Sequence, residues 1–141
     1  MARSDFRFSH RLRVRWAEAD MQGVVFNGNY LLYFDIGITE YLRALASDDA
    51  SMRETFDRLY VVKATVEYHA GAHFDEEIDV CVRCARLGRS SMLIRFEIHR
   101  GEAHLISGEN VYVYTEAGAS APVPPALREA IAAFEVVEPQ S

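Results

Sequence analysis

Apolar and polar residues alternate in the segment 6–16. One set consists of Phe8, His10, Leu12, Val14 and Trp16, and the residues between them are serine and arginine. A period of two residues is typical of a strand that buries one face. The sequence therefore predicts a half-buried strand over residues 6–16.

The segment 29–45 predicts a long helix that is buried on most sides. It contains no proline, and its apolar residues recur at helical spacing around most of the circumference. At 1.5 Å per residue, this helix would be roughly 25 Å long, about the width of a small domain. Gly37 in its interior would cost about 1 kcal/mol relative to alanine, which indicates close packing there.

Four strand-like segments follow a short helix predicted within residues 47–57. They cover residues 59–69, 76–86, 90–100 and 103–115, with turn signals at Gly71, Gly88 and Gly101. The last three are joined by only a few residues, so we expect antiparallel neighbours, because a parallel crossover needs a dozen residues or more. Prolines precede residues 126–134, where we expect a short terminal helix.

This order of elements predicts one α+β domain over residues 1–141. The economical arrangement is a curved, five-stranded antiparallel sheet wrapped around the long helix. A sheet covered by a helix on one face leaves an edge and a second face that need cover, which favours a homo-oligomer.

Composition narrows the classes of function. The net charge of -6 argues against a surface that neutralises nucleic-acid phosphates. The chain begins without the apolar run of a signal peptide and has no uncharged apolar stretch of about 18 residues. We expect a cytoplasmic protein that neither inserts in a membrane nor binds nucleic acid.

Two residue pairs have spacings that suggest metal or redox chemistry. Cys81 and Cys84 form a C-x-x-C pattern, but on a strand they point to opposite faces, and no second ligand pair exists. His69 and His73 are four residues apart, which makes a metal pair on a helix but not at a strand end that contains Gly71. We expect no metal and no redox pair.

The segment 17–28 has no sustained period and is predicted to be a loop. It contains Asp20, Gly23, Asn27 and Gly28, and polar loop residues are candidates for function. The bland interpretation of Asp20 is that it caps a turn, as aspartate often does in loops that contain glycine.

The stretch 13–31 resembles the signature of the 4-hydroxybenzoyl-CoA thioesterase-like branch of the hotdog superfamily. The matching pattern is Asp20, two variable residues, Gly23, apolar residues at 24–26, and Asn29-Tyr30 at the helix start. Segments 65–70, 75–76 and 87–91 are similar to later parts of the family, so the resemblance covers residues 11–115. Relatives of the Tol-Pal-associated type usually have histidine where Asn27 stands and an Ala-Arg pair near Gly37, so that subgroup's substrate preference does not transfer.

The resemblance implies a hotdog fold and an acyl-CoA thioesterase that needs no cofactor. Asp20 would act as the nucleophile or as the general base, and the sequence leaves both open. Backbone N–H groups around Asn27, Gly28 and Asn29, at the positive end of the helix dipole, would bind the thioester oxygen. The Asn27 side chain is a further catalytic candidate.

The resemblance also places residues against the substrate at two points of the chain. Around the loop and the helix start these are Gly23, Val24, Asn29 and Tyr30. Around the Gly88 turn they are Arg86, Arg89 and Ser90, where guanidinium groups suit the CoA phosphates. The family further implies a homodimer or homotetramer with the site at the subunit interface.

Alternatives remain for the catalytic residue and for the function. Asp35 and Glu40 on the helix are rival carboxylates; we expect Asp35 to satisfy a buried partner and Glu40 to be solvated. An acyl-CoA hydratase or dehydratase would need a histidine paired with Asp20, and no such pair is evident. A non-catalytic module that binds acyl-CoA or acyl-carrier protein stays open, because fold does not fix function.

Overall fold

The computed structural model describes residues 3–47 and 49–141. Its elements in chain order are η1 Arg3–Asp5, β1 Phe8–Arg13, η2 Trp16–Glu18, α1 Asn29–Ala46, α2 Ala50–Phe56, β2 Leu59–Tyr68, β3 Glu77–Leu87, β4 Ser91–Arg100, β5 Ala103–Glu116, β6 Ala119–Ser120 and α3 Pro125–Phe134, where η denotes a 3₁₀ turn. The predicted long helix, four later strands and two short helices are therefore confirmed, with bounds that differ by a few residues.

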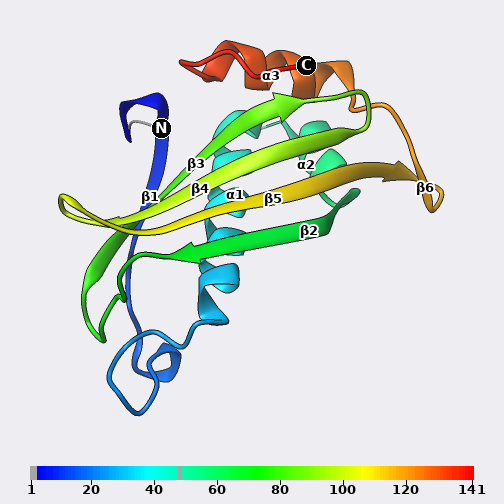
Figure 1. Ribbon diagram of the computed structural model, residues 1–141. Coiled ribbons are helices and arrows are strands. Elements are labelled where there is room, and N and C mark those ends of the chain that lie inside the picture. Colours follow the sequence, from blue (N-terminus) through cyan, green and yellow to red (C-terminus); the bar gives the residue numbers. More distant parts are fainter. Residues whose placement is uncertain (1–2, 48) are drawn as a thin grey trace.

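The strands form one antiparallel sheet in the order β1-β3-β4-β5-β2. The meander of β3, β4 and β5 follows the prediction, while β2 joins the far side of β5 and forms an edge. The two-residue strand β6 pairs antiparallel with the end of β5 and was not predicted. Figure 1 shows the curved sheet with α1 across one face, the α+β hotdog arrangement expected from the sequence.

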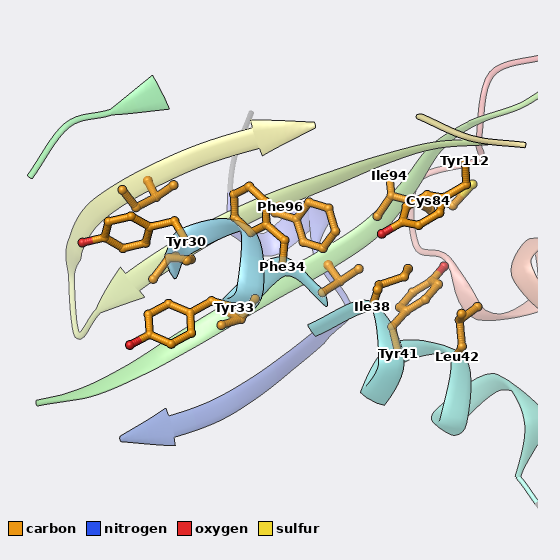
Figure 2. Close-up of a cluster of buried hydrophobic side chains, with 14 of the residues drawn as sticks. Tyr30, Tyr33, Phe34, Ile38, Tyr41, Leu42, Cys84, Ile94, Phe96 and Tyr112 are labelled. Carbon is orange, nitrogen blue, oxygen red and sulfur yellow. The ribbon is translucent and has the colours of Figure 1, made fainter. Parts of the chain in front are cut away.

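Helix α1 approaches the sheet closely because two glycines face the contact. A Cβ atom added to Gly37 would lie 2.7 Å from Cγ1 of Val80 on β3. On β5, a Cβ atom at Gly108 would lie 2.3 Å from the ring of Phe34. With that space open, Phe34 stacks on Phe96 of β4 with ring centroids 4.4 Å apart (Figure 2). The close packing predicted at Gly37 is thus confirmed.

The first strand is shorter than predicted. Strand β1 ends at Arg13, and Val14 is buried beyond it, but Trp16 lies in η2 and is 79% exposed. The Glu18 carboxylate accepts the Arg15 N–H at 2.8 Å, and the Glu18 N–H donates to the Arg15 carbonyl at 3.0 Å. This turn removes Trp16 from the alternating face, so the prediction that it lies on the buried side of a strand was wrong.

The two cysteines are buried and free, as expected from their strand positions. Burial raises the pKa of Cys81 to about 11 and the pKa of Cys84 to about 12, so both thiols are protonated near neutral pH.

Within residues 3–47 and 49–141, no helix has the length and apolar character needed to cross a bilayer.

The contact at Gly37 generates a prediction about stability. Alanine would gain about 1 kcal/mol of helix propensity, but forcing a methyl group against Val80 costs roughly 1–3 kcal/mol. We expect Gly37→Ala to lower the free energy of unfolding by about 1 kcal/mol in urea titrations. In a Val80→Ala background the same substitution should cost less, because only Cγ2 of Val82, 3.1 Å from the added Cβ, still crowds it. Destabilisation of equal size in both backgrounds would contradict this account.

Candidate functional site

The loop between β1 and α1 contains a tight hairpin with Asp20 at its start. Ala19 and Val25 form an isolated bridge, and the Asp20 N–H donates to the Val24 carbonyl at 2.8 Å. Gly23 closes the turn by donating to the Asp20 carbonyl at 3.0 Å, with a φ of 80° that favours glycine. The hairpin is itself anchored to residues 72–74, since the Val25 N–H donates to the Ala72 carbonyl at 2.9 Å.

The side chain of Asp20 is exposed, and only one of its oxygens is used within the chain. Oδ1 accepts the Gln22 backbone N–H at 2.8 Å. This is the turn-capping role expected from an aspartate in such a loop. In the described part of the chain, Oδ2 has no hydrogen bond, so the residue caps its turn and still presents a carboxylate oxygen to solvent.

An apolar cavity of about 620 Å³ lies beside Asp20. It is lined by Trp16, Ala19, Asp20, Met21, Gly23 and Phe74. Trp16 and Phe74 contact edge to face, with ring centroids 5.2 Å apart, and Met21 is fully exposed. An exposed carboxylate therefore stands against a wall of large apolar side chains.

These apolar neighbours were not identified from the sequence. Trp16 was assigned to a buried strand face, and neither Met21 nor Phe74 belongs to a periodic segment. One sequence feature could have identified them. Large apolar residues occur there in segments that have neither helical nor strand periodicity, so the buried face of a helix or strand does not account for them.

The N-terminus of α1 presents two backbone N–H groups. Asn29, Tyr30 and Leu31 donate to carbonyls three residues earlier, at 2.9, 3.4 and 3.3 Å. The expectation that the Asn29 amide is unpaired was therefore wrong, because the helix opens with a tightened, 3₁₀-like turn. Among the described residues, the N–H groups of Asn27 and Gly28 make no hydrogen bond and remain available.

Glu18 holds the start of α1 in place. Its carbonyl accepts the Asn29 side-chain amide at 2.9 Å and the Phe26 N–H at 3.0 Å. Its carboxylate accepts the Tyr33 hydroxyl at 2.8 Å. Burial and this carboxylate raise the pKa of Tyr33 far above its usual range, so the hydroxyl stays protonated and keeps donating.

Tyr30, a predicted substrate contact, also has a structural role in a single chain. It is 2% exposed, and its hydroxyl oxygen accepts the Ala72 N–H at 3.0 Å. Burial raises the pKa of this hydroxyl. Its ring borders a second cavity, of about 250 Å³, together with Asn27 and Tyr68, and the Tyr68 hydroxyl donates to the Asn27 carbonyl at 3.1 Å.

Within one chain, the predicted site residues fall into separate groups. Asp20 and Gly23 border the apolar cavity, while Asn27 and Tyr30 border the second one. Val24 links the hairpin to His73 through an isolated bridge. The two candidate catalytic elements are thus neighbours in the loop but do not share one enclosed pocket.

Arg86, Arg89 and Ser90 lie at the other end of the sheet. The β1–α1 loop follows Arg13, which pairs with Glu77 at the start of β3. The three residues lie at the opposite end of β3, around the turn that follows Leu87. Eleven strand residues span roughly 35 Å. Figure 1 shows the β1–α1 loop and the β3–β4 turn at opposite ends of the molecule.

Of the rival carboxylates on α1, Asp35 does not satisfy a buried partner as predicted, whereas Glu40 lies in an ion pair at the surface. Asp35 is exposed and lines a groove of about 480 Å³ between α1 and α2. Burial, with the Asp35 charge, raises the pKa of Tyr112 in that groove to about 12. Glu40 is half-buried and pairs with Arg43 at 2.7 Å. Neither borders the cavity beside Asp20.

A family model described as "Thioesterase superfamily" matches residues 22–107, more than half of the chain. The chain belongs to the thioesterase superfamily. The matched segment contains the start of α1 and the Gly88 turn, while Asp20 lies two residues before it.

Individual relatives agree with this family. An acyl-CoA thioesterase YbgC from Haemophilus influenzae is 29% identical over 97 residues, covering 68% of this chain and 71% of that protein. An acyl-CoA thioester hydrolase YbgC from Escherichia coli is 26% identical over 106 residues, covering 75% and 79%. A thioesterase from Thermus thermophilus, solved with coenzyme A and zinc, is 30% identical, with a TM-score of 0.83 and coverage of 93% and 96%.

The anchoring of α1 yields a prediction about its first turn. Asn29→Ala removes the hydrogen bond to Glu18 and should lower the free energy of unfolding by about 1 kcal/mol. It should also speed hydrogen exchange of the amides in the first turn of α1. The matched control is Asn27→Ala, whose side chain makes no hydrogen bond among the described residues and whose loss should leave stability nearly unchanged. Equal effects of the two substitutions would contradict the anchoring role.

Proposed function

We propose that Asp20 supplies the catalytic carboxylate of an acyl-CoA thioesterase and that the Asn27 and Gly28 amides bind the thioester oxygen. Membership of the thioesterase superfamily makes the chain a thioester hydrolase. The observation that carries the assignment to Asp20 is its exposed carboxylate, with one oxygen not hydrogen-bonded among the described residues, against an apolar cavity.

The chemistry needs two groups and no cofactor. A carboxylate must attack the thioester carbon or activate a water molecule, and Asp20 serves either route. Hydrogen-bond donors must stabilise the oxyanion, which typically contributes about 10²-fold to 10³-fold in rate per donor. The unpaired amides of Asn27 and Gly28 stand at the positive end of an 18-residue helix, which favours negative charge there. The leaving thiolate needs little assistance, because a thiol has a pKa near 8.5.

The surroundings of the site suggest how the substrate lies. Trp16, Met21 and Phe74 offer apolar surface for the acyl group next to Asp20. The guanidinium groups of Arg86 and Arg89 make no hydrogen bond or ion pair among the described residues and suit the CoA phosphates. Because these arginines are a sheet length away from Asp20 in one chain, the proposal assigns them to the phosphates bound at the other subunit's Asp20.

The proposed assembly is a homodimer that pairs the two β2 edges, either alone or within a homotetramer. Strand β2 hydrogen-bonds only to β5 among the described strands, so its outer edge has unpaired backbone groups. It also exposes Tyr60, Val61 and Val62, at 58%, 50% and 61%. Antiparallel pairing across a two-fold axis would satisfy the edge and cover these side chains.

Two alternatives fit the site less well. A hydratase needs a histidine next to the carboxylate, and the cavity beside Asp20 is lined by none of the described histidines. A non-catalytic module that binds acyl-CoA or acyl-carrier protein would not need an available carboxylate oxygen. With a CoA thioester as substrate, the proposed place of action is the cytoplasm.

The function is tested by replacing Asp20. Asp20→Asn keeps an oxygen that can accept the Gln22 N–H but removes the negative charge, so the fold should persist. With a panel of short-chain, long-chain and aromatic acyl-CoAs, thiol release should fall at least about 10²-fold in kcat. Asp35→Asn is the matched control and should retain activity. Full activity of Asp20→Asn would make Asp35 or Glu40 the candidate, and absence of hydrolysis by the wild type would favour the binding module.

The assembly is tested on the β2 edge. Val62→Lys places a charge where two apolar edges would meet, and light scattering should show a smaller assembly with reduced thioesterase activity. Val136→Lys changes a valine of similar exposure, 59%, in the segment after α3 and should leave the assembly intact. If Val62→Lys retained the wild-type mass, the proposed β2 interface would be wrong.

A further inference from the structure

A cluster of titratable side chains lies on the outer face of the sheet, away from α1. Phe96 and Ile98 of β4 are buried in the core, so the alternate residues Glu97 and His99 project from the opposite face. Both are nonetheless buried, with side chains 10% and 8% exposed. Nε2 of His99 donates to Oε1 of Glu97 at 2.9 Å. A carboxylate and an imidazole are thus held together with little solvent.

A β-bulge brings a second histidine to the same face. Ile98 pairs with Ile106, but the next pair is His99 with His104, so Leu105 is an extra residue in β5. Without the bulge, Leu105 would stand opposite His99. With it, His104 stacks on His99 with ring centroids 4.7 Å apart, while Leu105 is fully buried. Bulges re-aim side chains in this way and are frequent beside functional sites.

The potential ligand atoms of these three residues converge. One oxygen of Glu97 and one ring nitrogen each of His99 and His104 all lie within 4.8 Å of one another. Tetrahedral zinc, with bonds of 2.0–2.1 Å to nitrogen, holds its ligand atoms roughly 3.3 Å apart. A movement of about 1.5 Å, available to the exposed His104 ring, would therefore complete the geometry.

We propose that Glu97, His99 and His104 bind a divalent transition-metal ion of the zinc class. Imidazole and carboxylate ligands favour zinc over magnesium or calcium, which prefer oxygen ligands alone. Binding requires His104 to leave the Ile106 carbonyl, to which its Nε2 now donates at 2.9 Å. Each histidine nitrogen that binds the ion must also give up its proton to solvent, including Nε2 of His99 if that atom is the ligand. Water occupies the fourth coordination position. The proposal differs from the sequence-based expectation of no metal, which considered only the Cys81–Cys84 and His69–His73 pairs.

Neighbouring residues provide support and access for the ion. The Ser107 hydroxyl lies 3.0 Å from Nε2 of His104 and 3.0 Å from Nε2 of His69, so His69 orients the cluster from the end of β2. A cavity of about 240 Å³ opens beside Glu97 and is also lined by Glu67, Arg95 and Glu109. Glu109 is paired with Arg95 at 2.9 Å, so Glu67 is the further carboxylate whose charge would attract a cation. His73 is not part of the cluster and pairs with Glu76.

One nearby carboxylate is excluded as a ligand by its surroundings. Asp79, the cross-strand neighbour of His99, is engaged by Arg3 at 3.0 Å and Arg11 at 2.9 Å. The ion would therefore link β4 to β5 and stabilise their hairpin, independently of hydrolysis at Asp20.

The test uses the full chain without a polyhistidine tag, treated with chelator and then dialysed. Calorimetric titration with ZnCl₂ should show one ion bound per chain, and MgCl₂ should give no binding. At zinc concentrations about 100-fold above Kd, the Tm should rise by roughly 5–10 °C. A zinc anomalous signal between Glu97, His99 and His104 in crystals would place the ion.

Three substitutions distinguish this site from other zinc-binding positions. His99→Gln and His104→Gln should each weaken zinc binding at least about tenfold and reduce the rise in Tm by about half or more. His104 is exposed, so its replacement tests the site even if His99→Gln impairs folding. His10→Gln, on the opposite face of the sheet, should bind zinc like the wild type. Absence of zinc binding by the wild type, or unchanged binding by His104→Gln, would overturn the proposal.

Discussion

The structure depends on how closely α1 can approach the curved sheet. At Gly37 the helix has no side chain, so its backbone lies so close to Val80 that an added methyl group would clash with it. This closeness permits Tyr30, Tyr33, Phe34 and Tyr41 to be almost fully buried around it (Figure 2). Since the core is packed to crystal-like density, a helix held farther out would leave voids along its whole length.

The position of the helix determines the position of the candidate site. The first turn of α1 is held by the packing of its buried tyrosines in the core and by Glu18, which accepts hydrogen bonds from Asn29 and Tyr33. The hairpin with Asp20 is attached to the same region through Ala19, Val25 and residues 72–74. These hydrogen bonds reduce the conformational entropy that the loop would lose when a substrate binds.

The sequence was sufficient to predict the elements and the layer arrangement, because both follow from periodicity. Residues 29–45 show helical spacing on most sides, and only a sheet that wraps around the helix can bury them. Tertiary contacts were not accessible in the same way. Trp16 continues the alternation of β1, but the capping interaction of Glu18 turns the chain before it.

Site residues divide along the same line. Asp20, Gly23 and Asn27 were predicted as site residues from a loop pattern and a family resemblance, and remain predictions. The structural roles of Asn29 and Tyr30 depend on partners distant in sequence, Glu18 and Ala72. The Glu97, His99 and His104 cluster escaped detection because the bulge at Leu105 changes which residue of β5 faces His99. A one-residue change of register is invisible to pattern analysis, since it alters no local propensity.

Gly108 packs against both the core and the edge strand β2. A side chain there would meet the Phe34 ring and would also come within 2.9 Å of the Thr65 carbonyl on β2. A smaller residue at position 34 would remove only the clash with the ring, because the clash with Thr65 is with a backbone carbonyl. Any lineage that replaces this glycine must therefore displace the outermost strand as well, so a position hidden beneath the helix constrains the evolution of the sheet's outer edge.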